Sequence, residues 1–177
     1  MSGLYHCKNF IDDTTQNQFI DFINNQSWNT SIKRRTQHYG YEYNYKITDS
    51  KKLKKIYEIP DIYKPTIQRI ENIIYKRFKK VYKFDQMIIN EYTNGQGISK
   101  HIDNPRIFDE YVVTISLGTD CIINFVKEDE YIDLKVEPGD LLLLTKDSRY
   151  IFSHEIKPNN INNLDTPRIS LTFRKII

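Results

Sequence analysis

Two histidines and one aspartate are the residues of this chain whose types and spacing could hold a metal ion. His101 and Asp103 are separated by one residue, and His154 lies much further along the chain. On a β-strand, residues i and i+2 point to the same side, so His101 and Asp103 can share one metal while His154 arrives from another strand. Two imidazoles and one carboxylate form a three-ligand face that suits Fe(II) and leaves positions open for a co-substrate and O2.

Two arginines near the C-terminus extend this pattern. Arg168 and Arg174 are six residues apart, so on an extended strand both side chains face the same way. A planar guanidinium beside a metal is well suited to anchor a dicarboxylate through paired hydrogen bonds. The residues therefore predict an Fe(II) oxygenase that uses 2-oxoglutarate.

The structural alternative is that each of these residues is ordinary. An isolated His-x-Asp pair is more often a surface or hydrogen-bonded pair than a metal site. A later histidine in a strand-rich region and two arginines at strand spacing shift the balance. The order and spacing of the whole set favour the metal site, whereas no single member decides it.

The bulk composition indicates one globular domain. The chain has 177 residues, of which 39% are hydrophobic and 28% charged, a balance typical of folded rather than disordered proteins. The longest apolar run, Leu141 to Leu144, is too short to span a membrane, and residues 1–13 show no secretory signal. Cys7 and Cys121 do not form a Cys-x-x-Cys motif, which favours a reducing, intracellular compartment, with the cytoplasm as the expected location.

The charge is unevenly distributed, although the net charge is only +3. Residues 1–100 carry 17 Lys and Arg against 10 Asp and Glu, while residues 101–177 carry 9 against 13. The basic excess lies in three clusters, at residues 33–35, 51–55 and 76–80. Such clusters can follow phosphates, although a solvated helix or loop face explains any one of them. Together they favour a polyanionic partner.

The elements that must position these residues are N-terminal helices followed by a β core. Asp12 or Asp13 can cap a helix to about Gln26, with Phe19, Phe22 and Ile23 on its inner face. Residues 35–45 predict a strand with Gly40 in its middle, and residues 50–62 a basic, irregular connection. Pro65 suits the first turn of a helix that packs through Ile67, Ile70, Ile74 and Phe78.

From residue 84 onward, short apolar runs alternate with turn signals such as Asn94-Gly95-Gln96-Gly97 and Pro138-Gly139-Asp140. This spacing predicts a sandwich or barrel. The predicted strands are residues 86–92, 111–117, 121–126, 131–136, 141–145, 149–156 and 169–176. The fold class is therefore mainly β with N-terminal helices (α+β), in one domain of residues 1–177: helices and a substrate lid over 1–83, and a catalytic core over 84–177.

The assembled motifs resemble the AlkB group of Fe(II)/2-oxoglutarate dioxygenases, whose fold is a double-stranded β-helix, or jelly roll. The similarity is greatest to the branch that hydroxylates a modified wobble uridine in tRNA, and it extends over residues 33–177. The matching stretches are residues 34–43, 85–103 (DQMIINEYTNGQGISKHID), 116–118, 148–154 and 167–175.

The resemblance implies that His101, Asp103 and His154 ligate Fe(II) and that Arg168 pairs with the distal carboxylate of 2-oxoglutarate. It implies further hydrogen bonds to this co-substrate from Asn90, Tyr92, Ser170 and Arg174. Oxidation of an N-methyl group would demethylate a base, whereas oxidation of a uridine side chain would leave a hydroxyl. The shared iron site permits both outcomes, so the substrate pocket decides between them.

Two departures from the base-repairing members favour the tRNA branch. Those members often carry an acidic residue after His-x-Asp, where this chain has Asn104-Pro105-Arg106. Their lid often presents an aromatic side chain, where this chain has Arg34 and Arg35. Arg34, Arg35 and Arg106 are therefore expected to contact a substrate that carries negative charge.

Other residues of the lid region leave alternatives open. Tyr39, Tyr41 or Tyr43 could still stack on a base. His38 is either a functional histidine or, as is commoner, a hydrogen-bonded structural one. Relatives in the tRNA-modifying branch often carry an RNA-binding module and a methyltransferase, and neither is expected within the 177 residues of this chain. Its own basic clusters or a partner protein would then hold the RNA, and the oligomeric state is open.

Three other readings compete with tRNA hydroxylation. An oxidative demethylase of alkylated DNA or RNA bases would release formaldehyde from methylated oligonucleotides. A non-catalytic jelly-roll binding module would have lost a metal ligand or an arginine, and none is missing. A protein hydroxylase would not need the basic N-terminal half.

Overall fold

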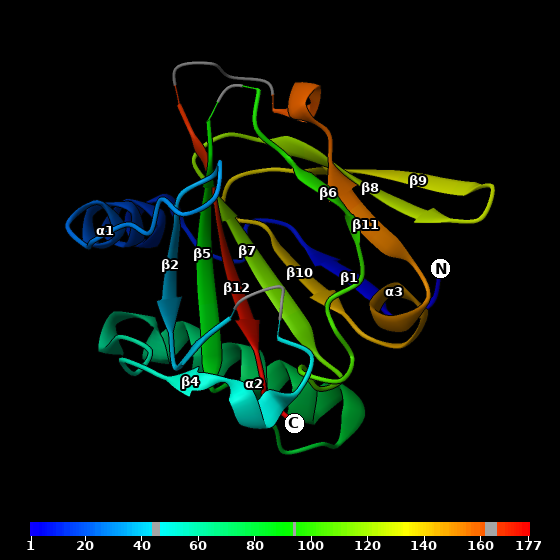
Figure 1. Ribbon diagram of the computed structural model, residues 1–177, viewed down its shortest axis with the longest axis horizontal. Helices are drawn as coiled ribbons and strands as arrows, with labels where there is room; N and C mark the ends of the chain where they lie inside the picture. Colours follow the sequence, from blue (N-terminus) through cyan, green and yellow to red (C-terminus); the bar gives the residue numbers. More distant parts are fainter. Residues whose placement is uncertain (44–46, 94, 162–165) are drawn as a thin grey trace.

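A computed structural model of the chain describes residues 1–43, 47–93, 95–161 and 166–177, with the side chain of residue 159 excluded, and contains two β-sheets that face each other (Figure 1). The strands are β1 (Leu4–Cys7), β2 (Thr36–Tyr39), β3 (Tyr41–Glu42), β4 (Lys54–Lys55), β5 (Gln86–Tyr92), β6 (Ile98–His101), β7 (Val112–Leu117), β8 (Cys121–Lys127), β9 (Glu130–Val136), β10 (Leu141–Leu144), β11 (Ser153–Ile156) and β12 (Arg168–Arg174). The helices are α1 (Asp13–Asn24), α2 (Lys64–Phe78) and α3 (Lys146–Tyr150), with 3-10 turns η1 (Ser50–Lys52), η2 (Asp61–Tyr63) and η3 (Pro158–Asn160).

The larger sheet has the strand order β1-β10-β7-β12-β5-β2, and the smaller sheet has the order β6-β11-β8-β9. All pairings within both sheets are antiparallel. Together with the solved structure reported below, this arrangement confirms the predicted jelly roll with N-terminal helices. The pair β3 and β4 forms a separate two-stranded ribbon beside α2.

Alternation along β12 explains how one strand serves two surfaces. Ile169, Leu171 and Phe173 belong to the core shared with helices α1 and α2. The intervening residues Arg168, Ser170, Thr172 and Arg174 line a cavity between the two sheets. Because successive side chains point to opposite faces of a strand, the motif Arg-Ile-Ser-Leu-Thr-Phe-Arg carries a polar face and an apolar face at once.

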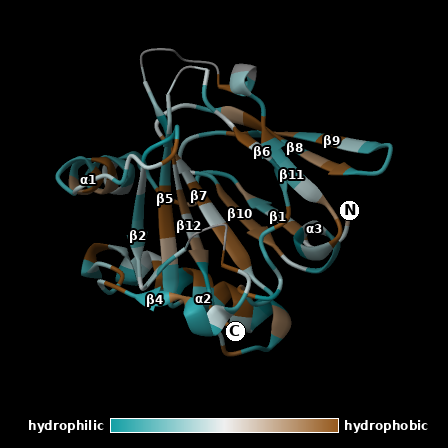
Figure 2. Cartoon of the chain, in the orientation of Figure 1, coloured by the Kyte–Doolittle hydropathy of each residue, from teal (hydrophilic) through white to brown (hydrophobic). Residues whose placement is uncertain are grey.

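Helices α1 and α2 pack on the face of the larger sheet that is turned away from the smaller one. Helix α1 begins at the predicted cap, where the Asp12 carboxylate accepts a hydrogen bond of 2.8 Å from the Thr15 amide. Helix α2 has its proline in the first turn and buries Ile67, Ile70 and Ile74. Figure 2 shows brown, hydrophobic stretches along β5 and β10, while α2 alternates between teal and brown.

Two predicted elements differ in the structure, and an N-terminal strand was not predicted. The strand expected over 35–45 is interrupted at Gly40, which has a φ of +75° and hydrogen-bonds to the backbones of Ile56 and Tyr57, so the chain leaves the sheet there. The strand expected over 149–156 begins as helix α3, because Thr145 and Ser148 form a reciprocal capping box. Strand β1 has no counterpart among the predicted elements; it pairs with β10.

Parts of two predictions lie outside the described residues: positions 44 and 45 of the strand and position 94 of the turn. The prediction of one domain over residues 1–177 stays a prediction. Within the described ranges, no helix is long and apolar enough to cross a membrane.

Candidate metal and co-substrate site

A cavity of about 130 Å³ lies between the two sheets, and most of the predicted site residues line it. Its polar wall comes from strands β5 and β12 of the larger sheet and from β6, β11 and the loop after β6. Its apolar wall includes Ile123 and Phe125 of β8 and Leu142 and Leu144 of β10. The predicted residues on this wall are Asn90, Tyr92, His101, Asp103, His154, Arg168, Ser170 and Arg174.

The two histidines are brought together by pairing of β6 with β11. His101 and His154 are directly opposite each other in the register of these strands, and their ring centroids are 4.4 Å apart. The Nδ1 atom of His101 lies 2.8 Å from the Ser99 carbonyl oxygen. A proton on Nδ1 would donate to that carbonyl and leave Nε2 as the ligand atom.

Asp103 completes the cluster, but not by the predicted route. Strand β6 ends at His101, so Asp103 lies in the following loop and the alternation of a strand does not place it. Its side chain is instead held by Arg174, whose Nη1 donates to Oδ1 over 2.6 Å. One ligand atom from each of His101, Asp103 and His154 lies within 4.8 Å of the others.

The charges around this cluster favour the protonation states that a metal requires. Burial raises the pKa of Asp103, but Arg174, the two imidazoles and a second buried arginine outweigh burial and lower it to about 2. Burial, followed by the neighbouring His101, lowers the pKa of His154 to about 4. At neutral pH the carboxylate is therefore ionised and the His154 imidazole neutral. Their 3.7 Å contact is not a salt bridge at that pH.

The other end of β12 presents a different arginine. Arg168 is 1% exposed, and within the described part of the chain its Nε and Nη1 have no hydrogen-bond partner. Its guanidinium lies 5.3 Å from the centre of the Tyr92 ring. A buried guanidinium with unsatisfied donors is costly unless an anion accepts from it. This observation fits a carboxylate ligand.

Arg34 and Arg35 are separated by the sheet, although both were expected to contact substrate. Arg34 Nε donates to Asn90 Oδ1 on the cavity face of β5 over 2.9 Å. Arg35 turns to the opposite face and donates to both carboxylate oxygens of Glu91, over 2.6 and 2.8 Å, while stacking on Trp28. Adjacent residues of β5 point to opposite faces, which explains the division.

Of the remaining residues expected to contact substrate, Tyr39, Tyr41 and Arg106 do not line the cavity. Tyr39 is buried in the core beneath the helices, Tyr41 borders a second cavity beside α2, and Arg106 is exposed on the turn after Asp103. Tyr43 does reach the cavity, where it packs against Phe108, with ring centroids 4.9 Å apart. Phe108 itself is buried and does not line the cavity, and as a lone aromatic in a loop it gives no periodic signal in the sequence.

His38 has the properties of a structural histidine. Its Nε2 lies 3.2 Å from Thr36 Oγ1, and its Nδ1 accepts from the Tyr43 amide over 3.3 Å. Burial, then the charge of Arg174, lowers its pKa to about 4. His38 therefore stays neutral at pH 7 and holds the chain segment that carries Tyr43.

Comparisons with known proteins agree with this geometry. Residues 3–174 match the family model of the 2OG-Fe(II) oxygenase superfamily. The chain is 27% identical to the Alkylated DNA repair protein ALKBH8 homolog of Arabidopsis thaliana, with 98% of this chain and 58% of that protein covered. It is 29% identical to the mouse (Mus musculus) tRNA (carboxymethyluridine(34)-5-O)-methyltransferase ALKBH8, with 97% of this chain and 26% of that protein covered.

A solved structure supports the fold. An oxidoreductase of the 2OG-Fe(II) oxygenase family from Burkholderia pseudomallei superposes with a TM-score of 0.72 at 11% identity, covering 97% of this chain and 83% of that one. At that identity the likeness concerns the fold alone. The chain spans little more than half the length of the Arabidopsis relative and about a quarter of the mouse relative.

Proposed function

The chain belongs to the 2OG-Fe(II) oxygenase superfamily, as an AlkB-like member, and from that premise we propose that it hydroxylates a modified wobble uridine in tRNA. Members of this superfamily are dioxygenases that use Fe(II), 2-oxoglutarate and O2. One observation carries the assignment of the site. Three metal-ligating groups, His101, Asp103 and His154, converge at one end of the cavity. At the other end, Arg168 is buried and has donors without a hydrogen-bond partner among the described residues.

We assign His101, Asp103 and His154 as the ligands of Fe(II). Two imidazoles and one carboxylate are the donor set of non-haem Fe(II) oxygenases, and the low pKa values of Asp103 and His154 leave both ready to bind a cation at neutral pH. When bound, Fe(II) and 2-oxoglutarate would supply the oxidising chemistry, in which 2-oxoglutarate, O2 and a substrate C–H group give succinate, CO2 and the hydroxylated substrate.

The remaining polar residues of the cavity bind and orient the co-substrate. Arg168 would pair with the distal carboxylate, because its buried guanidinium needs an anion. Asn90, Tyr92 and Ser170 line the wall beside it and would complete the hydrogen bonds. Arg174 donates to Asp103, so its main role would be to fix that metal ligand, with any contact to 2-oxoglutarate as a second role.

The choice of nucleic acid as substrate rests on the relatives and on surface charge. The mouse relative is named for an enzyme that acts on carboxymethyluridine at position 34 of tRNA. Arg34 does not itself line the cavity, but its Nε donates to Asn90, which does, so its guanidinium could meet a negatively charged group of the substrate there. A substrate with its own charge, such as a carboxymethylated uridine, would suit this position.

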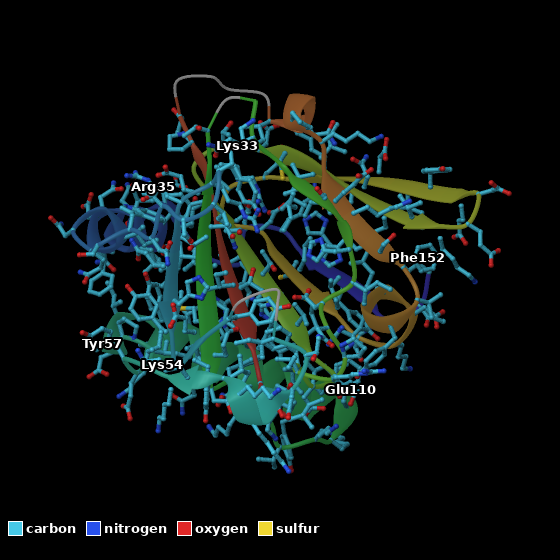
Figure 3. All side chains as sticks on the ribbon, viewed as in Figure 1. Lys33, Arg35, Lys54, Tyr57, Glu110 and Phe152 are labelled. Atoms are coloured by element: carbon cyan, nitrogen blue, oxygen red, sulfur yellow. The ribbon has the colours of Figure 1, made fainter. Side chains whose placement is uncertain are left out.

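An exposed basic segment beside the ribbon of β3 and β4 is a candidate surface for the RNA backbone. Lys51, Lys52, Lys54 and Lys55 are all exposed, and Tyr57 follows them with 84% of its surface exposed. Figure 3 shows Lys54 and Tyr57 near each other at the lower left, with Lys33 at the top. Basic residues interleaved with an exposed aromatic are typical of surfaces that hold single-stranded nucleic acid. A partner protein that supplies further RNA contacts would be compatible with this arrangement.

A second candidate function is oxidative demethylation of alkylated bases. The Arabidopsis relative is named as an alkylated DNA repair protein. Tyr43 places one aromatic ring on the cavity wall, where it could stack on a flipped base, and the buried ring of Phe108 packs against it. The two functions differ in product, because demethylation releases formaldehyde and uridine hydroxylation does not.

The test measures succinate formed from 2-oxoglutarate with Fe(II), ascorbate and air, with and without total tRNA. The proposal expects stimulation by tRNA and a gain of one oxygen on a wobble uridine by mass spectrometry. Methylated DNA and RNA oligonucleotides run in parallel, with formaldehyde as the readout. Rapid formaldehyde release without any change in tRNA would replace the first function by the second, and the His154→Ala variant is the background control.

A further inference from the structure

Arg149 is a fully buried arginine of helix α3, and its side chain faces the loop that carries Asp103. Only 2% of its surface is exposed. Its Nη1 donates to the main-chain carbonyl of Asp103 over 2.6 Å, and its Nη2 donates to that of Phe108 over 2.8 Å. Its Nε donates to the carbonyl of Asp109 over 3.3 Å. All three of these bonds end on one loop.

The far end of this loop is bonded to the C-terminal segment, where Phe108 pairs with Ile176, whereas Asp103 lies in no strand of the described chain. Strand β6 ends at His101, two residues before Asp103. Arg174 holds the Asp103 side chain, but a side-chain contact alone leaves the main chain free to turn. The bond from Arg149 to the Asp103 carbonyl fixes the main chain at the same residue.

Helix α3 also leads directly into the strand that carries the third cluster member. Arg149 lies five residues before His154, and β11 begins at Ser153. The three guanidinium bonds therefore connect the segment that presents His154 to the loop that presents Asp103. A planar guanidinium with donors in fixed directions can bridge several carbonyls in one geometry, which a lysine ammonium cannot.

Burying a charged guanidinium is costly, and here its hydrogen bonds go to neutral carbonyls rather than to a carboxylate. An apolar side chain of similar volume would fill the same space at a lower desolvation cost. The desolvation cost of burying Arg149 is explained if its three hydrogen bonds hold the loop that carries Asp103 in place.

We propose that Arg149 is a positioning residue, which ties the Asp103 loop to the segment that precedes His154 and so sets the affinity and geometry of the metal site. The inference rests on the proposed metal ligands and adds a residue that does not touch the metal. Outer residues that orient metal ligands typically change metal affinity by ~10–100-fold when mutated.

The test is a titration of the metal-free full-length protein with Co(II), followed by visible absorption. Arg149→Met removes all three donors, and Arg149→Lys keeps the charge but not the three-way geometry. Arg69→Met is the control. Arg69 lies on helix α2 and, like Arg149, donates to a main-chain carbonyl, that of Phe10, over 2.7 Å. Each titration is run at low temperature and scaled to the folded fraction measured by circular dichroism.

The expected result is a 10–100-fold weaker Co(II) affinity and an altered Co(II) spectrum in both Arg149 variants, with Arg69→Met equal to wild type. A merely structural role would lower the melting temperature without changing affinity or spectrum in the folded fraction, and that outcome would overturn the inference alone. A wild-type protein that binds no Co(II) would overturn the proposed metal site, and the inference with it.

Discussion

The two ends of the cavity, marked by Arg174 and Arg168 on the same face of β12, are built in opposite ways. At the Arg174 end, the guanidinium pairs with Asp103 over 2.6 Å. Arg168, in contrast, pairs with no carboxylate of the described residues, and two of its buried nitrogens have no hydrogen-bond partner among them, against one such nitrogen, Nε, in Arg174. Both side chains are almost fully buried, so burial does not explain the difference.

The difference indicates what each end requires from a ligand. The metal end is organised by contacts within the protein, because the charges of Arg174 and Asp103 offset each other before any ligand binds. At the Arg168 end, two buried guanidinium nitrogens have no hydrogen-bond partner among the described residues, and a carboxylate would remove the cost of leaving them unpaired. One end should therefore contribute to folding stability by itself, while the other should contribute only when an anion is bound.

Loss of a metal ligand should have the largest effect. His101→Ala, Asp103→Ala and His154→Ala should each reduce 2-oxoglutarate turnover to background, because the ligand set is incomplete. Asp103→Ala should also destabilise the metal-free protein, by ~3–5 kcal/mol, since Arg174 would lose its buried partner. Turnover assays and urea unfolding of the metal-free variants measure the two effects. Asp61→Ala, at an exposed position, is the control, and near-normal turnover in any ligand variant would refute the assignment.

The two arginines should respond oppositely to the same substitution. Arg174→Met should cost ~3–5 kcal/mol of stability in the absence of ligands, because Asp103 would be left buried without its cation. Arg168→Met should leave ligand-free stability unchanged or raised, while greatly increasing the KM for 2-oxoglutarate. Denaturant unfolding and co-substrate kinetics give the two readouts. Equal destabilisation by both substitutions would break the comparison between the ends.

Addition of 2-oxoglutarate should stabilise the wild-type protein through Arg168. With the metal present, a concentration of 100 times Kd should raise the free energy of unfolding by ~2.7 kcal/mol. Arg168→Met should show almost no increase at the same concentration, whereas Arg35→Gln should respond as wild type does. Thermal unfolding with and without the co-substrate measures the shift, and an undiminished shift in Arg168→Met would remove this residue from the site.

Arg34 and Arg35 allow a second comparison, between the two faces of the larger sheet rather than between the two ends of β12. Arg34→Gln should weaken binding of substrate or co-substrate, with little effect on stability, because its side chain meets Asn90 on the cavity face. Arg35→Gln should instead cost ~1.5–3 kcal/mol of stability, because it removes charged hydrogen bonds to the buried Glu91. Steady-state kinetics and unfolding of the two variants would show whether the effects separate; identical profiles would contradict the placement.

The burial of His38 should also appear in the pH dependence of stability. Its pKa is about 4 in the folded protein, lowered by burial and then by Arg174, with Glu42 acting in the opposite direction. The unfolded chain takes up the proton first as pH falls from 6.5 to 4, so stability is lost in that window.

The His38→Gln variant isolates this contribution. It should remove ~1–2 kcal/mol of the pH-dependent change between pH 6.5 and 4, a figure reduced from the full linkage value because the ring is partly exposed. Urea unfolding at several pH values provides the measurement, and the difference between the two proteins cancels other titrating groups. Parallel curves for both proteins would show that His38 does not titrate in this window.

The sequence alone determined the groups available for chemistry and the faces on which several of them lie. Alternation along residues 168–174 correctly placed Arg168 and Arg174 on one face, because the two-residue period of a strand is a local property that can be read from the sequence. The helical spacing around Ile67, Ile70 and Ile74 and the capping aspartate before α1 were local signals of the same kind.

Tertiary structure alone decided which of those groups meet. Asp103 reaches the histidines through a loop held by Arg174 and Arg149, from strands and helices distant in sequence. The opposite orientations of Arg34 and Arg35 depend on which residues of β5 they meet. Long-range partners such as these are set by the packing of whole sheets, for which a single sequence without coordinates provides no period or motif.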